Sequence, residues 1–410
     1  MSRTIHPHGA APVHVVGIGA DGWDGLGAAA RAEVLAADVV LGGRRHLASL
    51  PDAPGQRREM WPSPLRAGLT DLLDSFGTAS VVALASGDPL LSGVATTLID
   101  LLGGDRVTVR PAVSSVALAR AAMGWPAESH AVVSVVGRDV ALVHRELAPG
   151  RRILVLSSDE RTPRRVAGLL VASGYGDSRL TVLGDLGGEH SSREDAPARL
   201  VAEGDDDFPR LNVIAVSCTG PRIGGWTPGL PDDLFEHDGQ LTKRDLRASA
   251  LARLAPTPGE HLWDVGAGAG SIGIEWLRTH PACTATAIEA DPERAARIAR
   301  NASRLGVPAL HVVHGRAPQA LDGLRTPDAV FVGGGATRPG VLDTCLTALR
   351  PGGRLVVHGV TLQTERLLAD AYGRHGGELT RIAVETAAPV GTFTGWTPAR
   401  TVTQWAWTSG

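Results

Sequence analysis

The chain has 410 residues, of which 43% are hydrophobic and 20% charged, with a formal net charge of -3. A chain of this length is too long to fold around one ordinary hydrophobic core, so we predict two domains. The small net charge gives no long-range attraction to nucleic acid or to an anionic membrane, so we expect neither as a partner.

The cysteines and the N-terminal residues indicate in which cellular compartment the protein is expected. The three cysteines, Cys218, Cys283 and Cys345, contain no CxxC pair, so we expect neither a disulfide framework nor a bound metal. Residues 1–12 contain no apolar signal segment, and no apolar run approaches a membrane-spanning length. These features predict a cytoplasmic protein.

The first half of the chain alternates short β-rich runs with helical stretches. Apolar runs predict buried strands at residues 13–18, 81–85, 132–136, 153–156 and 213–217. Helical periodicity predicts helices between them, at residues 27–37, 93–102, 114–123 and 163–172. Such alternation is typical of α/β layers in which at least part of the sheet is parallel.

Turn motifs rich in glycine and proline follow several of these strands. Glycine permits a close backbone approach, and proline pre-sets a rigid turn. Each motif alone is a weak signal. Ser86-Gly87-Asp88-Pro89, for example, fits a simple type I turn equally well. Four motifs nevertheless occur in order: Gly17-Ile18-Gly19-Ala20, Gly42-Gly43-Arg44-Arg45-His46, Ser86-Gly87-Asp88-Pro89 and Pro111-Ala112-Val113-Ser114-Ser115.

Together these motifs resemble the tetrapyrrole methylase family. The resemblance implies a domain at residues 11–222, with two α/β lobes that hold S-adenosylmethionine (SAM) between them. The sequence departs from the family pattern at Ala20, where proline is common, and at Val136, where histidine is frequent. By this resemblance SAM is held largely through backbone groups of Gly17, Gly19, Gly87, Asp88, Pro89, Ser114 and Ser115.

Three arginines close to these motifs are candidates for substrate binding. Arg44, Arg45 and Arg138 carry planar guanidinium groups that match carboxylates, such as the acetate and propionate groups of a tetrapyrrole. They fit solvated surface charge equally well.

Residues 221–231, PRIGGWTPGLP, are rich in glycine and proline and predict an interdomain linker over residues 223–237. A second α/β series follows. No sequence repeat relates the two halves, so we predict a different domain at residues 238–410. Its buried strands are predicted at residues 262–265, 284–288, 310–313, 329–332 and 354–358.

The clearest motif of the second half is a strand that runs into a glycine-rich turn and then a helix. Gly266-Ala267-Gly268-Ala269-Gly270 allows the backbone to approach a nucleoside cofactor closely. Glu289 ends the next predicted strand, where its carboxylate can accept hydrogen bonds from ribose hydroxyls. The loop alone also fits NAD(P), but the GxGxG spacing after Asp264 favours SAM.

Further segments of this half resemble the C-terminal domain of precorrin-6Y C5,15-methyltransferases (decarboxylating). The similar segments are residues 238–248, 315–318, 331–335 and 395–405. The resemblance implies a SAM site formed by Thr242, Asp264, Gly266, Ala267, Gly268, Ala269, Gly270, Glu289, Arg316 and Ala317.

Residues 238–248 also contain candidates for substrate binding. Lys243 or Arg244 is a candidate for contacting a substrate carboxylate, although this segment also fits the exposed start of an amphipathic helix. Gln363 stands where the family commonly has glutamate, and an amide cannot transfer a proton. His358 is a possible substitute, but a lone histidine is more often structural.

The sequence therefore predicts an α/β fold throughout, with an N-terminal two-lobed tetrapyrrole methylase and a C-terminal class I SAM-dependent methyltransferase of Rossmann-like topology. The resemblance implies methylation of precorrin-6Y at C5 and C15 with decarboxylation of the ring C acetate, giving precorrin-8X in cobalamin biosynthesis. We expect one SAM site in each half and a homo-oligomer.

No catalytic residue is predicted, because methyl transfer from a sulfonium requires proximity and alignment more than a nucleophile and a base. Two alternatives stay open at this point. One is an NAD(P)-dependent oxidoreductase, and the other is a non-catalytic tetrapyrrole carrier.

Overall fold

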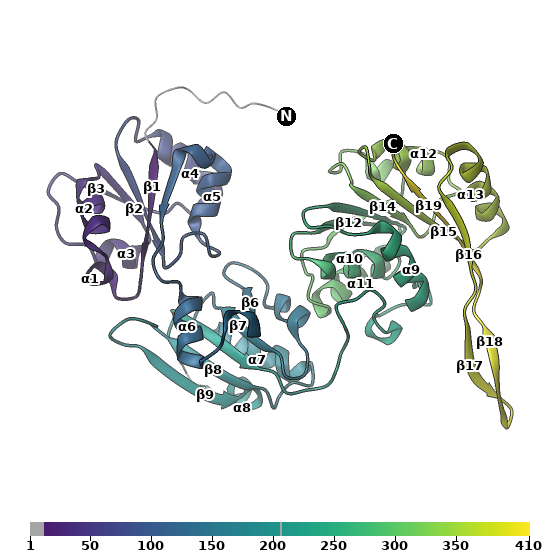
Figure 1. Ribbon diagram of the computed structural model, residues 1–410, viewed down its shortest axis with the longest axis horizontal. Helices are drawn as coiled ribbons and strands as arrows, with labels where there is room; N and C mark the ends of the chain where they lie inside the picture. Colours follow the sequence, from purple (N-terminus) through teal and green to yellow (C-terminus); the bar gives the residue numbers. More distant parts are fainter. Residues whose placement is uncertain (1–11, 206) are drawn as a thin grey trace. The chain divides into compact units, whose positions relative to one another are not determined.

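The computed structural model describes residues 12–205 and 207–410. The N-terminal segment in which no signal peptide is predicted, residues 1–12, therefore lies almost wholly outside the described residues. The chain divides into two compact units (Figure 1). One unit extends to Val140 and includes Ala148–Pro221, and the other comprises Ala141–Leu147 and Arg222–Gly410. The predicted boundaries at residues 11–222, 223–237 and 238–410 stay predictions.

The first sheet of the N-terminal unit is fully parallel, in the order β3-β2-β4-β1-β5. Its central strands are buried on both faces, which explains their almost continuous apolar sequences. The strands are β1 (Val13–Ile18), β2 (Val39–Gly42), β3 (Arg57–Met60), β4 (Val81–Ser86) and β5 (Val107–Arg110).

Helices cover both faces of this sheet. Val34 of α2 packs with Val16 and Leu84 on one face, whereas Leu69 of α4 and Leu98 of α5 pack on the other. The helices are α1 (Gly22–Gly25), α2 (Ala28–Ala36), α3 (Arg44–Ala48), α4 (Leu65–Asp74) and α5 (Val94–Leu102), followed by the 3₁₀ turn η1 (Gly104–Arg106).

The second sheet of this unit is mixed, in the order β6-β7-β10-β8-β9, and only β6 and β7 pair in parallel. Its strands are β6 (Ala131–Ser134), β7 (Arg152–Leu156), β8 (Arg179–Gly184), β9 (Ser192–Pro197) and β10 (Asn212–Ser217). They are accompanied by α6 (Ser115–Met123), α7 (Thr162–Ala172), α8 (Ala198–Glu203) and the 3₁₀ turn η2 (Ala127–Ser129). The 3₁₀ turn η3 (Val140–Glu146) lies, apart from its first residue, in the stretch Ala141–Leu147 that belongs to the other unit. The strand predicted at 132–136 ends earlier, at Ser134, because Val136 is exposed in the turn that follows.

The C-terminal unit has a sheet of order β13-β12-β11-β14-β15-β19-β16. The first five strands are parallel, and β19 and β16 are antiparallel to their neighbours. The strands are β11 (His261–Val265), β12 (Thr284–Glu289), β13 (His311–His314), β14 (Ala329–Val332), β15 (Arg354–Gly359), β16 (Glu378–Ile382) and β19 (Val402–Thr408).

Helices again cover both faces of this sheet. Leu251 of α9, Trp276 of α10 and Ile298 of α11 pack on one face, and Cys345 of α12 and Leu368 of α13 pack on the other. The helices are α9 (Arg244–Leu254), α10 (Ser271–Thr279), α11 (Pro292–Arg304), α12 (Val341–Ala348) and α13 (Leu362–His375), with the 3₁₀ turns η4 (Asp232–Leu234) and η5 (Gln319–Leu321). The predicted α/β architecture is confirmed in both units.

A two-stranded hairpin, β17 (Glu385–Val390) and β18 (Phe393–Pro398), projects from the sheet of the C-terminal unit (Figure 1). Its tip carries large apolar side chains in solvent: Phe393 is 79% exposed and Trp396 is 71% exposed. No helix among the described residues is both long and apolar enough to cross a membrane.

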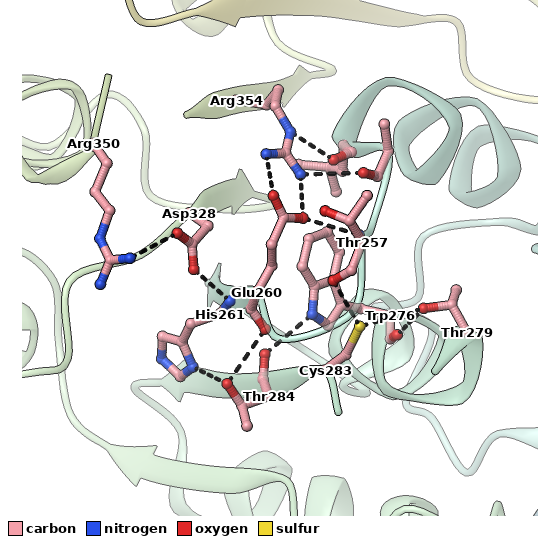
Figure 2. A network of polar contacts seen from close by, with 12 residues as sticks. Thr257, Glu260, His261, Trp276, Thr279, Cys283, Thr284, Asp328, Arg350 and Arg354 are labelled. Atoms are coloured by element: carbon pink, nitrogen blue, oxygen red, sulfur yellow. Dashed lines mark hydrogen bonds and ion pairs between the residues drawn. The ribbon is translucent and has the colours of Figure 1, made fainter. Parts of the chain in front are cut away.

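The amino ends of the parallel strands are joined by polar contacts (Figure 2). Arg354, at the start of β15, forms a two-pronged pair with Glu260 at 2.7 and 2.6 Å and also donates to the Leu254 carbonyl at the end of α9. Asp328 accepts from the His261 backbone N–H at 2.8 Å and pairs with Arg350. These contacts hold together the amino ends of the strands, at the end of the sheet opposite the carboxyl ends.

A buried ion pair holds the segment that leads into this unit. Arg247 of α9 is fully buried, and its Nε donates to Glu275 of α10 at 2.6 Å. Glu275 also accepts the backbone N–H groups of Gly229 and Leu230, at 2.6 and 3.0 Å. Arg247 in turn donates to the Thr242 carbonyl at 2.5 Å.

Part of the predicted linker consequently packs against the C-terminal unit. Leu230 and Phe235 are each 3% exposed and belong to the same hydrophobic cluster as Trp276. The guanidinium carbon of Arg247 lies 4.7 Å from the ring centre of Phe235. The glycine-rich and proline-rich composition of residues 221–231 therefore coexists with an ordered path.

Loss of the Arg247 charge should destabilise the C-terminal unit strongly. In Arg247→Met, Glu275 keeps a buried charge without its cation, and such a loss typically costs about 3–5 kcal/mol. Urea denaturation of the full-length protein measures this cost. Arg381→Met is the matched control, because its pair with Glu365 leaves the arginine side chain 67% exposed, and it should change stability by less than about 0.5 kcal/mol. Equal effects of the two substitutions would contradict the assignment.

Candidate active sites

The C-terminal unit contains a cavity of about 710 Å³ at the carboxyl ends of its parallel strands. The ends of β11, β12, β14 and β15 reach it through Val265, Glu289, Phe331 and His358. Strand order reverses between β11 and β14, so the loops after these strands diverge and leave a crevice there.

Most residues predicted for the C-terminal site line this cavity. Those that line it are Thr242, Lys243, Gly266, Ala267, Gly268, Glu289, Arg316 and Ala317. Four predicted residues lie outside the lining: Asp264, Ala269, Gly270 and Arg244.

The glycine loop between β11 and α10 has a backbone that other residues rarely adopt. Gly266 and Gly268 have φ angles of 67° and 59°, in the left-handed region. A Cβ on Gly266 would lie 2.7 Å from the Gly334 carbonyl oxygen of the loop after β14. Glycine is therefore required for the two loops to approach each other at the cavity.

Glu289 connects this loop to the end of the neighbouring strand. Its carboxylate accepts the Gly268 N–H at 2.8 Å through Oε2 and the Asp291 N–H at 3.0 Å through Oε1. The side chain is 6% exposed and lines the cavity. Each carboxylate oxygen has a further lone pair, so Glu289 can accept hydrogen bonds from a ligand without releasing the loop.

Asp264, the residue before Val265 at the end of β11, binds the first turn of α10 on the other side of the glycine loop. It is 1% exposed, and its Oδ2 accepts the Gly273 N–H at 2.9 Å. Burial raises the pKa of this carboxyl to about 7, with repulsion from Glu289 acting in the same direction and the Gly273 N–H opposing both. Oδ1 is buried without a hydrogen-bond partner among the described residues.

The segment before α9 forms another wall of the cavity. Thr242 and Lys243 line the cavity, and the Lys243 ammonium lies 3.6 Å from Asp232. Arg244 is exposed at the first turn of α9, outside the lining, where its side chain lies beside Gly229. The structure thus brings Lys243, and not Arg244, to the cavity.

Several lining residues carry charge or polarity that the sequence analysis did not assign to the site. Arg338 follows the Gly333–Gly335 turn and Arg400 precedes β19, and both are exposed. Arg400 lies within the similar segment 395–405 and Arg338 lies shortly after the segment 331–335, but neither segment by itself shows that these side chains reach the cavity. With Lys243 and Arg316 they supply cationic groups suited to a substrate that carries carboxylates.

His358 lies in the floor of this cavity, whereas Gln363 is exposed on α13, outside the lining. The His358 Nε2 is 2.9 Å from the Gln404 Oε1, and its ring meets Phe331 edge-on at 5.0 Å. Burial lowers the pKa of His358 to about 4, although the bond to Gln404 opposes the shift. At neutral pH the imidazole is therefore uncharged.

The N-terminal unit contains a second cavity, of about 700 Å³, lined by residues from both of its sheets. Of the predicted residues, Gly19, Gly87, Ser115 and Arg45 line it. Ala20 and Val136, the two positions that depart from the family pattern, also line it.

Other predicted N-terminal residues support the lining from outside. Gly17 packs directly against the Gly87 carbonyl, where a Cβ would clash. Asp88 Oδ1 accepts the Leu90 N–H at 2.9 Å and shapes the Gly87-Asp88-Pro89 turn. Ser114 caps α6 by accepting the Ala117 N–H at 3.1 Å.

The remaining predicted arginines of this unit do not reach the cavity. Arg44 and Arg138 are exposed and lie outside the lining. Their alternative interpretation as surface charge fits these positions. Arg210 and Asp185, which the sequence analysis did not single out, line the cavity instead.

Family models match both halves of the chain. The model of tetrapyrrole (corrin/porphyrin) methylases matches residues 12–199, and the model of the precorrin methyltransferase domain matches residues 233–409. A precorrin-6Y C(5,15)-methyltransferase [decarboxylating] of Sinorhizobium sp is 46% identical, over 97% of this chain and 96% of its own length. The chain belongs to this family.

Shorter proteins are similar to parts of the chain. A cobalt-precorrin-6B C(15)-methyltransferase (decarboxylating) of Salmonella typhimurium is 33% identical over 40% of this chain and 86% of its own length. A cobalt-precorrin-7 C(5)-methyltransferase of the same organism is 34% identical over 42% of this chain and 83% of its own length. The crystal structure of the C-terminal domain of precorrin-6Y C5,15-methyltransferase from Rhodobacter capsulatus is 42% identical, covers 45% of this chain and 99% of that chain, and has a TM-score of 0.43.

Family membership confirms the predicted fold class and the assignment as a SAM-dependent methyltransferase. It favours this function over an oxidoreductase or a non-catalytic carrier. Among the described residues, no group of three or more His, Cys, Asp and Glu side chains could hold a metal ion.

The C-terminal cavity fits the SAM that this family uses. The left-handed Gly266 and Gly268 leave room for a nucleoside close to the backbone, and a Cβ on Gly266 would block the contact between loops. Glu289 offers buried carboxylate lone pairs at the end of the neighbouring strand.

Substitution of Glu289 should weaken SAM binding at the C-terminal site alone. Glu289→Ala removes a hydrogen bond to a charged acceptor, worth roughly 1.5–3 kcal/mol, and so should lower affinity by about 10- to 150-fold. Calorimetry of the full-length variant measures this change. Glu293→Ala, an exposed change at the start of α11, is the control and should bind SAM like the unmodified protein. Unchanged affinity in Glu289→Ala would contradict the assignment.

Proposed function

We propose that the chain methylates precorrin-6Y at C5 and C15 and decarboxylates its ring C acetate, which gives precorrin-8X in cobalamin biosynthesis. The observation that carries this proposal is the 46% identity, over 97% of this chain, to a precorrin-6Y C(5,15)-methyltransferase. In addition, each of the two units contains one large cavity.

The two activities divide between the halves. The C-terminal half methylates C15 and decarboxylates, and the N-terminal half methylates C5. Two separate Salmonella proteins carry C(15) and C(5) methyltransferase names, and each is similar to about two fifths of this chain. Their existence as independent proteins supports two independent active sites within one chain.

In the C-terminal site, Gly266, Ala267 and Gly268 cradle SAM and Glu289 binds its ribose hydroxyls. Thr242, Arg316 and Ala317 complete the wall, and all of these residues line the cavity. Asp264, Ala269 and Gly270 act indirectly, since they shape the loop without lining it. Bound SAM supplies a methyl group already activated on a sulfonium.

In the N-terminal site, Gly19, Gly87 and Ser115 contact SAM directly. Gly17, Asp88, Pro89 and Ser114 hold the turns that present these groups, which their contacts outside the lining support. This site relies on backbone groups, because its glycine turns carry no buried carboxylate equivalent to Glu289.

The protein contributes mainly proximity and alignment to both methyl transfers, which can be worth about 7–11 kcal/mol. Substrate carboxylates are held by Lys243, Arg338 and Arg400 in the C-terminal cavity and by Arg45 and Arg210 in the N-terminal cavity. The conjugated macrocycle itself provides the electron sink for decarboxylation. Two sites in one chain keep the intermediate at a high effective concentration.

The protein acts in the cytoplasm as a homo-oligomer. The apolar hairpin tip, with Phe393 and Trp396 in solvent, supports association, since such residues are rarely left exposed together. Light scattering of the full-length protein should give a mass of at least two chains, and Trp396→Ser should lower that mass. A single-chain mass for the unmodified protein would contradict the proposal.

The reaction product tests the proposed activity directly. Mass spectrometry of precorrin-6Y after incubation with the protein and SAM should show two methyl groups gained and one CO2 lost. Glu289→Ala should lose C15 methylation and decarboxylation together, and methylation at C5 remains possible in this variant if the order of the two methylations allows it. Loss of SAM binding at both sites in a folded variant, measured by calorimetry, would contradict the independence of the two sites.

A further inference from the structure

A cluster of three polar side chains forms part of the N-terminal cavity. Arg45 and His46 lie in α3, directly after β2, and Ser86 is the last residue of β4. All three line the cavity. His46 is 8% exposed, whereas Arg45 keeps an exposed face.

The Arg45 guanidinium is held only by uncharged acceptors. Its Nη2 lies 3.1 Å from the His46 Nε2, and its Nη1 donates to the Gly19 carbonyl at 3.4 Å. No carboxylate of the described residues lies within ion-pair distance of it. Asp185 and Asp21 act on it only at longer range, where they oppose the lowering of its pKa by burial. The positive charge of Arg45 thus stays uncompensated by direct contact, and most donors of its fork stay free.

The contact between Arg45 and His46 determines the tautomer of the imidazole. Arginine is only a donor, so the His46 Nε2 must present its lone pair and the proton must reside on Nδ1. The Ser86 hydroxyl, 3.1 Å from the same Nε2, must then also act as a donor. The one lone pair of Nε2 is therefore shared between Ser86 and Arg45, and the protonated Nδ1 is buried without a hydrogen-bond partner among the described residues.

The surroundings of His46 keep this lone pair available. Burial and the neighbouring Arg45 charge lower the pKa of the imidazole to about 4, and the Leu84 backbone opposes them only partly. Because the folded pKa lies below the usual 6.5, His46 is neutral at all pH values well above 4. Acidification towards pH 4 would place a proton on Nε2 and convert an attraction into repulsion.

We propose that neutral His46 is a positioning residue, which holds the Arg45 fork towards the cavity so that it binds a peripheral carboxylate of the tetrapyrrole substrate. The inference rests on the proposed C5 methylation by this unit. A carboxylate partner on the protein would neutralise Arg45 and compete with the substrate. A neutral acceptor fixes the fork without competing for its charge.

The role of His46 predicts an effect on substrate binding and not on chemistry. In full-length His46→Leu, Arg45 loses an acceptor but the cavity keeps its volume, so KM for precorrin-6Y in C5 methylation should rise by about 10-fold with kcat unchanged. His46→Gln offers a carbonyl oxygen to Arg45 and should restore KM to within about 3-fold of the unmodified protein. His190→Leu, a change at an exposed histidine of the same unit, is the matched control.

A second measurement addresses the tautomer in the unmodified protein. Nitrogen-15 NMR of histidine-labelled full-length protein, assigned by comparison with His46→Gln, should show His46 as the Nδ1–H tautomer with no titration between pH 8 and pH 5. An Nε2–H tautomer, or a titration near pH 6.5, would overturn the proposal.

The kinetic outcomes separate this proposal from the proposed function. Absence of C5 methylation in the unmodified protein would refute the function itself, whereas the NMR result would still stand. Normal methylation with an unchanged KM in His46→Leu would overturn the positioning role alone. Reduced kcat or weaker SAM binding in His46→Leu would also overturn it, because His46 would then act on the cofactor turns.

Discussion

The buried carboxylate of Glu275 is the anchor on which the C-terminal active site depends. It binds Arg247 and two backbone N–H groups of the segment that leads into the domain. Arg247 then binds the Thr242 carbonyl, beside the residues that close one side of the cavity. Charge buried in the helical layer thereby positions one wall of this cavity.

The two candidate sites are held in shape by different physical interactions. In the C-terminal site, Glu289 joins the glycine loop to the adjacent strand and leaves lone pairs for a ligand. In the N-terminal site, the Gly17 and Gly87 turns pack backbone against backbone, and the charged group, Arg45, is held by neutral acceptors. Both sites lie where loops follow parallel strands, because these loops diverge and expose backbone groups.

Sequence patterns predicted the elements that are buried on both faces. The strands β1 and β14 are apolar throughout, and their predicted positions at 13–18 and 329–332 are confirmed. The hairpin β17–β18 was not predicted, because Phe393 and Trp396 lie in solvent and follow no burial pattern. Strand β8 was also not predicted, although it is buried and follows residues 173–178, SGYGDS, which are rich in turn-forming residues.

The candidate sites were predictable to the extent that their residues end a strand or directly follow one. Gly266 and Glu289 belong to such positions, and both line the C-terminal cavity. Arg338, Arg400 and Arg210 reach the cavities from separate loops, so only the folded chain brings them to the site. Arg44 and Arg45 are neighbours in sequence, but the turn of α3 directs only Arg45 to the cavity.

The central claim is that each unit of the chain holds its own SAM molecule. Calorimetric titration of the full-length protein with SAM measures the number of sites directly. The account predicts a stoichiometry near two per chain, since the two cavities share no residue. A clean stoichiometry of one would contradict it.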